Sequence, residues 1–189
     1  MLDDSLYFQD GFEGAKVVMS PPLRKKKDQV ALWAAINQNL VQHVATDHCP
    51  FCMEQKAMGK DDFSKIPNGA PGVENRFELL YSEGVGKGRI SLNKFVEMSS
   101  TGAAKIFGLF PRKGTIAVGS DADIIIFDPQ VKHVISAATH HMNVDYNAYE
   151  GWELQGKTRT TILRGTVAID RGEALVGKGF GKYLKRPPL

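Results

Sequence analysis

The feature that most constrains this fold is a pair of short apolar, β-branched segments separated by a helical stretch. Residues 15–19 read AKVVM and stop at Ser20, before two prolines that no helix could continue. Residues 41–46 read VQHVAT. Strand, helix and strand at this spacing predict a βαβ unit with parallel strands. Because two parallel strands form no stable sheet alone, we expect further strands from elsewhere, or a chain that is the C-terminal fragment of a larger protein.

Helical periods fill most of the remaining residues up to 110. Between the two predicted strands, residues 29–40 read QVALWAAINQNL, and we expect Asp28 to cap this helix. The side chains expected along one side of it are Val30, Trp33, Ala34 and Ile36. Three more helices are predicted over 74–85, 91–100, with Ser91 as N-cap, and 102–109. Residues 50–74 contain Gly, Pro and Asp, and a connection of this length is typically an active-site loop or a disordered segment.

At Pro111 the sequence changes to a β pattern. GTIAVGSDADIIIFDP predicts turn, strand, turn and strand, and VKHVIS is a further β-branched run. TRTTILRGTVAIDRGEALVG predicts two strands joined at Arg164-Gly165, then a turn at Arg171-Gly172 into a last short strand. We therefore expect an α/β region over 1–110 and a β region over 111–176, followed by a basic tail over 177–189.

Composition excludes several classes of protein. Apolar residues make up 42% of the chain and charged residues 24%, as in globular proteins, and no run approaches the roughly 18 apolar residues of a membrane span. The first ten residues are acidic where a signal peptide is basic, and two cysteines cannot form a disulfide framework. We therefore expect a cytoplasmic protein without a membrane partner.

Basic residues gather at two places without indicating a nucleic-acid partner. RKKK stands at 24–27 and GKGFGKYLKRPPL at 177–189, but the net charge is only +3. The tail offers only Phe180 and Tyr183 for base stacking, where single-stranded nucleic-acid sites use several aromatic side chains in a basic groove. We expect no nucleic acid, and we interpret both runs as solvated or docking segments.

The stretch VATDHCPFC, residues 44–52, holds the first candidates for chemistry. Cys49 and Cys52 could form a redox pair, but no helix start that would lower a thiol pKa is evident. They could bind zinc with His48, but no second cysteine pair supplies the further ligands that a structural site needs. We favour a third interpretation, in which both are free thiols packed beneath a loop.

Asp47 and Ser20 are candidates because of where they fall. Each follows a predicted strand, and reactive residues of (β/α)8 barrels lie at the C-terminal ends of strands. Two polar residues at the C-terminal ends of two parallel strands would face one pocket. The alternative, that Asp47 only caps the loop through its neighbouring backbone, is equally compatible with the spacing.

Longer segments add a family resemblance that covers nearly the whole chain in order. They are VMSPPLR (18–24), ATDHCPF (45–51), IPNGAPGVENR (66–76), SSTGAAKIFGLFPRKGTIAVGSDADIIIFDP (99–129), NVDYNAYEGWELQGK (143–157) and GKGFGKYLKR (177–186). Together they resemble the C-terminal part of the dihydropyrimidinase/hydantoinase family of cyclic amidohydrolases, whose relatives include the non-enzymatic collapsin-response-mediator proteins. The resemblance implies the last strands and helices of a metal-dependent (β/α)8 hydrolase barrel, followed by part of a small β-sandwich.

The resemblance also implies an activity and a site. These enzymes open cyclic amides and imides, such as dihydropyrimidines and hydantoins, with two zinc ions bridged by a carbamylated lysine and a hydroxide. Asp47 matches the family's aspartate that binds metal and shuttles the hydroxide's proton. Ser20 and Asn68 match positions whose backbone groups hold the imide ring. Family members generally form tetramers, and the tail resembles a segment that packs on a neighbouring subunit.

One departure from the family is large. The His-x-His pair, the carbamylated lysine and two further histidine ligands have no counterpart in this chain. Its histidines match none of them: His43, His48, His133, His140 and His141. We therefore expect the chain alone neither to hold two zinc ions nor to hydrolyse substrate. Two alternatives stay open, a non-catalytic interaction protein and a chain completed by a separately encoded N-terminal half.

Overall fold

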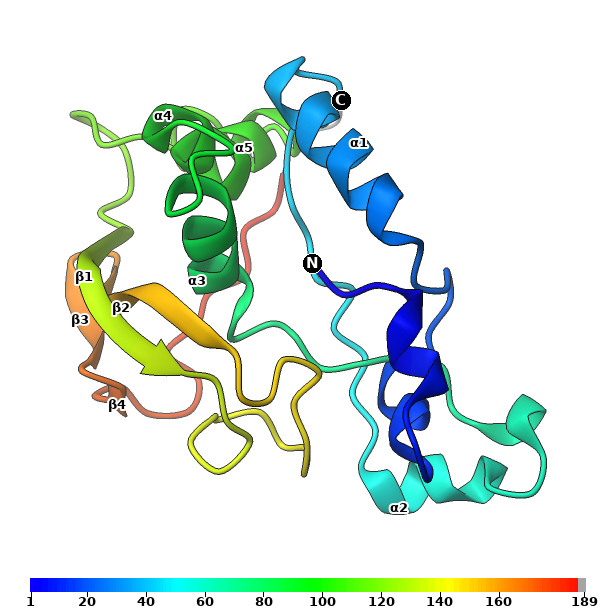
Figure 1. Ribbon diagram of the computed structural model, residues 1–189. Helices are drawn as coiled ribbons and strands as arrows, with labels where there is room; N and C mark the ends of the chain where they lie inside the picture. The colour runs from blue at the N-terminus through cyan, green and yellow to red at the C-terminus, as the bar shows by residue number, and fades with distance from the viewer. Residues whose placement is uncertain (187–189) are drawn as a thin grey trace.

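The computed structural model describes residues 1–186 and places a small sheet on the opposite side of the molecule from α1 and α2, with α3 beside the sheet (Figure 1). The strands are β1 (Ile124–Val134), β2 (Glu153–Leu163), β3 (Thr166–Asp170) and β4 (Glu173–Ala174). The α-helices are α1 (Lys26–Asn37), α2 (Met53–Lys56), α3 (Arg76–Leu80), α4 (Leu92–Val96) and α5 (Gly102–Ile106). Short 3-10 helices are η1 (Asp4–Phe8), η2 (Glu13–Val17), η3 (Ala57–Gly59) and η4 (Phe63–Lys65), and π-helical turns are η5 (Tyr81–Val85) and η6 (Glu97–Thr101). Residues 187–189, the end of the predicted tail, lie outside the described residues.

The four strands form one antiparallel sheet in the order β1-β2-β3-β4. The expected turns at Arg164-Gly165 and Arg171-Gly172 are confirmed, because they join β2 to β3 and β3 to β4. The register of β1 shifts between Asp128 and Lys132, around a proline that cannot donate to the ladder. The strand expected within residues 115–118 is wrong: these residues join no strand, and a turn follows, in which Ser120 N–H donates to Ala117 O at 3.1 Å.

The predicted βαβ unit is wrong for the described residues. Residues 13–17 form η2, so the apolar run at 15–19 is partly helical. Residues 41–46 are extended but pair with no described strand. Instead, Val44 N–H donates to Met98 O at 3.3 Å, and Val44 O accepts from Arg76 Nη1 at 3.1 Å. Helical residues thus satisfy both backbone groups of Val44, which the prediction assigned to a parallel ladder.

Helix α1 begins three residues earlier than predicted and packs through a narrower apolar side. Asp28 lies inside its first turn, where its carboxylate accepts from Lys25 N–H at 3.0 Å, so Asp28 is not the N-cap. Ile36 is buried and Trp33 packs on the core, as expected. Val30, however, is 69% exposed, and Ala34 is exposed too.

The remaining helical predictions are largely confirmed. Helix α3 and η5 cover the helix expected over 74–85, and α4 with η6 covers the one expected over 91–100. Ser91 is the N-cap of α4, since its Oγ accepts from Lys94 N–H at 3.1 Å. The long segment 50–74 is ordered, because α2, η3 and η4 divide it into short helical pieces.

Two buried clusters form the core, and α3 contributes to both. Leu80 belongs to the larger one, and its neighbour Leu79 to the smaller one. The buried members of the larger cluster are Ile36, Leu80, Ile90, Phe95 and Met98, and those of the smaller are Leu79, Ile135 and Leu154. Glu78 ties the same helix to the sheet, because its carboxylate accepts from Thr158 N–H at 3.0 Å and lies 3.0 Å from His133 Nε2. Helix α3 therefore joins the helical part to the sheet, together with η5, whose Ser82 Oγ accepts from Gln155 N–H at 3.1 Å.

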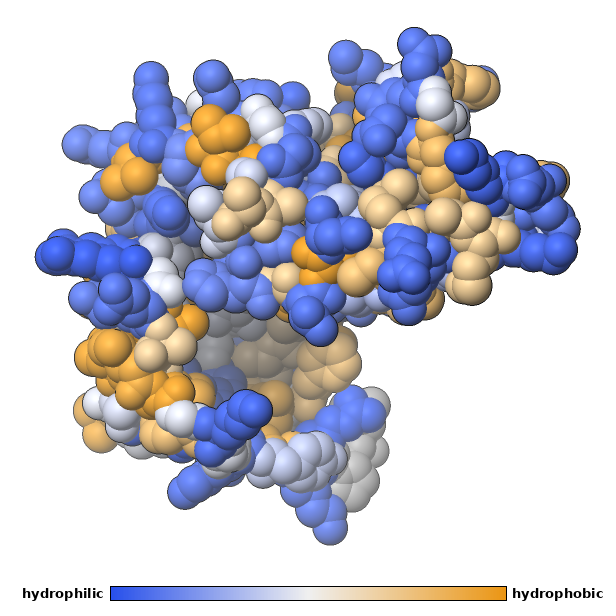
Figure 2. Space-filling model, turned by 90° about the horizontal axis from the view of Figure 1, so that it is seen from below, coloured by the Kyte–Doolittle hydropathy of each residue, from blue (hydrophilic) through white to orange (hydrophobic). Residues whose placement is uncertain are grey.

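Apolar side chains also reach the surface in several places, as the orange areas of Figure 2 show on one face. Phe8, Phe63, Ile116 and Val118 are each at least 81% exposed. Over residues 1–186 no helix combines the length and apolar character that crossing a lipid bilayer requires. The exposed apolar side chains are spread over loops, helices and strands, Ile126 of β1 among them.

Candidate functional site

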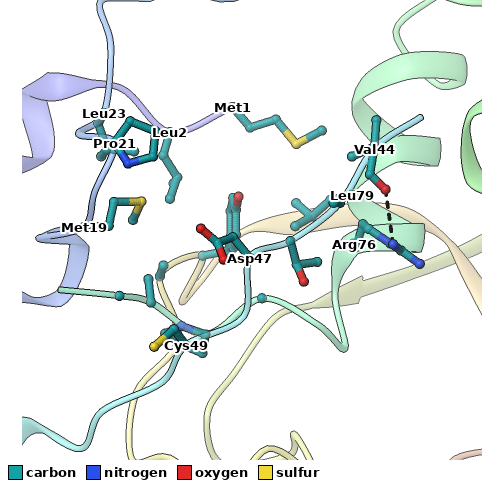
Figure 3. Close-up of a pocket in the computed structure, with 18 of the residues that line it drawn as sticks. Met1, Leu2, Met19, Pro21, Leu23, Val44, Asp47, Cys49, Arg76 and Leu79 are labelled. Atoms are coloured by element: carbon teal, nitrogen blue, oxygen red, sulfur yellow. Dashed lines mark hydrogen bonds between the residues drawn. The ribbon is translucent and has the colours of Figure 1, made fainter. Parts of the chain in front are cut away.

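A pocket of about 530 Å³ opens where four loops approach α3. Residues 19–23, 44–49 and 68–72 supply most of its wall, and the N-terminal Met1 and Leu2 close one side (Figure 3). Ala148 and Tyr149 come from the connection between β1 and β2. Segments far apart in the sequence therefore converge on one cavity.

Asp47 extends its carboxylate into this pocket, between the side chains of Met19 and Leu79 (Figure 3). Its backbone has φ of 47°, the left-handed region that Asp tolerates better than most residues. Cys49 N–H, the donor that a loop cap by Asp47 would use, donates to Ala70 O at 3.3 Å instead. The neighbouring His48 Nδ1 accepts from Gly72 N–H and Val73 N–H at 3.2 and 3.4 Å, and the Asp47 side chain is exposed.

The floor of the pocket is fixed by α3. Leu79 and Leu80 line it while packing into the two core clusters, and Arg76 lines it from the first turn of the helix. The hydrogen bond from Arg76 to Val44 O holds the segment that leads to Asp47 (Figure 3). The rigid core of the molecule therefore sets the position of the carboxylate.

The pocket brings together all three site residues predicted from the sequence. Ser20 and Asn68 line it with Asp47, and both are exposed. The loop carrying Asn68 is held to its neighbours by backbone bonds. Gly69 N–H donates to Val18 O at 3.0 Å, and Cys49 N–H donates to Ala70 O at 3.3 Å.

Lys56 is the buried residue near the pocket that sequence reasoning missed. Its side chain is fully buried, and Nζ donates to Val18 O at 3.1 Å, Pro67 O at 2.7 Å and Gly69 O at 2.8 Å. Burial lowers the pKa of this ammonium from 10.5 to about 8, and the negative charge that Cys49 can carry opposes that shift. In the sequence, a lysine after Glu and Gln is typical of a solvated helix surface, so no signal pointed to it.

The expected burial of both cysteines is wrong. Cys49 is exposed and lines the pocket, and Cys52 is half-buried. A helix also starts here, contrary to expectation: Cys52 is the N-cap of α2, whose Met53 N–H donates to Asp145 Oδ1 at 2.9 Å. Both thiols are free.

The side chains present do not by themselves fit a two-metal centre. No three His, Cys, Asp or Glu side chains in residues 1–186 are grouped so that they could hold a metal ion. The zinc clip considered for His48 and the cysteines is therefore not formed. Among the described residues that line the pocket, Asp47 is the one carboxylate and Cys49 the one thiol, and there is no imidazole. Two zinc ions require several more ligands.

Comparison with known proteins places this site in a family. Residues 12–168 match the family described as the amidohydrolase family. A D-hydantoinase from Geobacillus stearothermophilus is 53% identical over 188 residues, which cover 98% of this chain and 40% of that enzyme. A D-phenylhydantoinase from Escherichia coli is 44% identical over 190 residues, covering 100% of this chain and 41% of that enzyme.

Solved structures agree with the sequence relatives. The crystal structure of a dihydropyrimidinase from Brevibacillus agri has a TM-score of 0.97 at 51% identity, covering 98% of this chain and 41% of that one. An L-hydantoinase from Arthrobacter aurescens has a TM-score of 0.87 at 35% identity, covering 92% of this chain and 38% of that one. The resemblance inferred from the sequence is confirmed, and the chain spans about 40% of the length of the curated relatives it matches. By sequence and by fold, this chain belongs to the amidohydrolase family.

Proposed function

We propose that this chain is the C-terminal part of a metal-dependent cyclic amidohydrolase that hydrolyses the ring amide of dihydropyrimidines or hydantoins. One observation carries the proposal: a single pocket gathers Ser20, Asp47 and Asn68, three residues from separate segments that the family resemblance had selected. All three lie outside the helices and strands, and the pattern of strand ends had predicted only that Ser20 and Asp47 would meet.

Each of the three has a proposed role. The backbone groups at Ser20 and Asn68 hold the cyclic imide, whose edge presents both a hydrogen-bond donor and acceptors. The exposed Asp47 carboxylate accepts the proton of the attacking water and supplies one ligand to a zinc site. Since the other donors are absent from the described pocket wall, the rest of the ligand set must come from residues that this chain does not contain.

The same proposal extends to architecture and assembly. Residues 1–110 would complete a (β/α)8 barrel and residues 111–176 a β-sandwich once the remaining strands are supplied. The extended segment 41–46 has no strand partner among the described residues, and Ile116 and Val118 are exposed, as expected of surfaces that further chain covers. We further propose a cytoplasmic tetramer.

The part of the tail that the structure describes stays close to the body of the molecule. Arg164 Nη2 donates to Phe180 O at 2.6 Å, and the Arg186 guanidinium lies 5.9 Å from the centre of the Phe107 ring. These contacts leave Tyr183 91% exposed, which suits a segment that docks on a neighbouring subunit.

A non-catalytic assembly protein is the second candidate, and the exposed apolar side chains are the observation that favours it. A scaffold has no need for a carboxylate directed into a pocket, which is why we prefer the enzyme. Light scattering of the purified chain, combined with an activity assay, distinguishes the enzyme from the assembly protein. A defined oligomer that binds no cyclic amide, even when the missing part is supplied, would favour the scaffold.

The direct test is hydrolysis of dihydrouracil and hydantoin by the chain with added zinc. We expect no turnover by the 189 residues alone, because one carboxylate cannot hold a two-metal centre. We expect turnover when a separately expressed N-terminal part is added. Robust turnover by the chain alone would contradict the proposal that most zinc ligands come from outside this chain.

A further inference from the structure

Lys56 is an unusual residue to find buried. Its relative exposure is 0%, and no carboxylate of the described residues forms an ion pair with it. A buried ammonium loses its hydration, and this costs several kcal/mol unless its hydrogen bonds are replaced. Here they are fully replaced: three N–H donors meet three backbone carbonyl oxygens, at 2.7 to 3.1 Å.

The three carbonyls belong to the two loops that carry Ser20 and Asn68. Val18 lies two residues before Ser20, while Pro67 and Gly69 stand on either side of Asn68. One side chain on α2 thus joins both loops from behind the pocket. Gly69 N–H adds a direct bond between the same loops, since it donates to Val18 O at 3.0 Å.

The bonds to the Pro67 and Gly69 carbonyls, on either side of Asn68, bear on the direction of the Asn68 backbone N–H and C=O. In a trans peptide the C=O and the following N–H point in opposite directions. Because Pro67 C=O is directed at Lys56, Asn68 N–H points away from the ammonium. Because Gly69 N–H is directed at Val18 O, Asn68 C=O points away from Val18. That is the arrangement that recognition of an imide edge by backbone groups requires.

We propose that Lys56 is a positioning residue, which fixes the loops of Ser20 and Asn68 so that their backbone groups can bind the cyclic substrate. The identity of the ligand rests on the proposed function. The attachment of the two loops to Lys56, which we call the Lys56 clamp, does not depend on it. An apolar side chain of similar length would fill the same space but would leave the Pro67 and Gly69 carbonyls without this donor. The ammonium ties both loops to one point, which an apolar side chain could not do.

The test compares Lys56→Met, which removes the donors, with Lys56→Gln, which keeps an NH₂ group able to bond two carbonyls. Lys60→Met is the matched control, because Lys60 is exposed in the same segment. Amide hydrogen exchange by NMR at pH 7 reports on the loops through Gly69 and Cys49, and on the sheet through Thr161, which lies in the β1–β2 ladder.

For Lys56→Met we expect exchange at Gly69 and Cys49 to accelerate at least tenfold, with Thr161 unchanged. Lys56→Gln should fall between wild type and Lys56→Met, and Lys60→Met should match wild type. Unchanged exchange at Gly69 would overturn the proposal. Equal acceleration at Thr161 would also overturn it, because Lys56 would then be stabilising the whole fold. Should Lys56→Met fail to fold, the same criteria apply to Lys56→Gln.

Titration with dihydrouracil separates this inference from the proposed function. In wild type we expect shifts of the Ser20 and Asn68 amide signals, and in Lys56→Met a dissociation constant at least tenfold higher in samples whose Thr161 exchange shows that the sheet is still folded. An unchanged dissociation constant in Lys56→Met would overturn the positioning role. Absence of any amide shift in wild type would count against the proposed substrate. The hydrogen-exchange experiment would still test whether Lys56 holds the two loops.

Discussion

The sheet with α3 and the loops around Asp47 differ in what holds their backbone in place. The strands are joined by ladder bonds between neighbours in sequence, and aromatic rings pack on them: Tyr81 and Phe127 lie 4.6 Å apart, centre to centre. The loops have no ladder. They are held by isolated backbone bonds, such as Gly69 N–H to Val18 O, and by single side chains from distant positions that bind backbone groups: Arg76, Lys56 and His48. The sheet should therefore tolerate little change in packing, whereas loss of one side chain should loosen the loops locally.

The largest effect is expected from Gly156→Ala in β2. The added Cβ would lie 2.5 Å from Tyr81 Cδ1 and 2.6 Å from Phe127 Cζ, at φ of 91°. Separating the rings and straining the backbone should lower the free energy of unfolding by about 3 kcal/mol, measured by urea denaturation. Gly165→Ala is the control, because its φ is positive but its Cβ meets nothing within 4 Å. It should cost only about 1 kcal/mol, and equal losses in the two variants would refute the packing argument.

The same substitution in the loops, Gly69→Ala, should have a smaller global effect. Its Cβ would lie 2.2 Å from Cys49 O, so the two loops must separate. We expect a loss of about 2 kcal/mol in the free energy of unfolding, together with faster amide exchange at Cys49. Gly72→Ala lies in the same loop with open space around it and should resemble wild type. Faster exchange in the sheet of Gly69→Ala would show that the two regions are not independent.

Asn147→Ala probes the connection between the regions. Asn147 is buried; its Nδ2 donates to Asn75 Oδ1 at 2.8 Å, and its Oδ1 accepts from Tyr149 N–H at 3.0 Å. Removing both bonds leaves buried partners unsatisfied and should cost about 1.5 kcal/mol in urea denaturation. Asn143→Ala, at an exposed position of the same connection, serves as control and should be neutral. A neutral Asn147→Ala would mean that the link is dispensable.

The smallest effect concerns pH. The hydrogen bond that protonated His141 Nδ1 donates to Glu74 Oε1, at 2.8 Å, raises the pKa of His141. A raised pKa in the folded state means that the pair stabilises the protein fully below the unfolded value of 6.5, and that this contribution disappears as pH rises through the folded pKa. The pair is largely exposed, so we expect about 0.3 kcal/mol. Between pH 5.5 and pH 8.5 the urea midpoint should fall more in wild type than in Glu74→Gln. Equal falls in both proteins would show that the His141–Glu74 pair does not contribute to the pH dependence.

The difference between the two regions also explains what the sequence could predict. Both hairpin turns of the sheet and the Ser91 cap follow from residues adjacent to them, and the structure contains them as expected. The segment 41–46 has the composition of a strand, but whether it pairs depends on partners outside the local sequence. Its extended backbone is held here by Met98 and Arg76 instead.

Within the site, the family resemblance selected residues that the local pattern could not distinguish. From its spacing Asp47 could equally have been a loop cap, and only the fold shows that Cys49 N–H, the donor for such a cap, goes to Ala70 O. The burial of Lys56 could not be predicted, because the three carbonyls that bind its ammonium lie 11 to 38 positions away in the chain. The cysteines were misjudged because burial depends on the same long-range contacts.

The central claim is that this pocket is the C-terminal share of a hydantoinase site, with Asp47 as its metal ligand and proton acceptor. The most direct test is a chimera in which this chain replaces the matching 40% of the Geobacillus stearothermophilus D-hydantoinase. We predict that the chimera hydrolyses hydantoin with zinc, that Asp47→Asn lowers kcat/KM at least 100-fold, and that Asp61→Asn, at an exposed position without a pocket contact, leaves it unchanged. An active chimera that keeps its activity with Asp47→Asn would contradict the account.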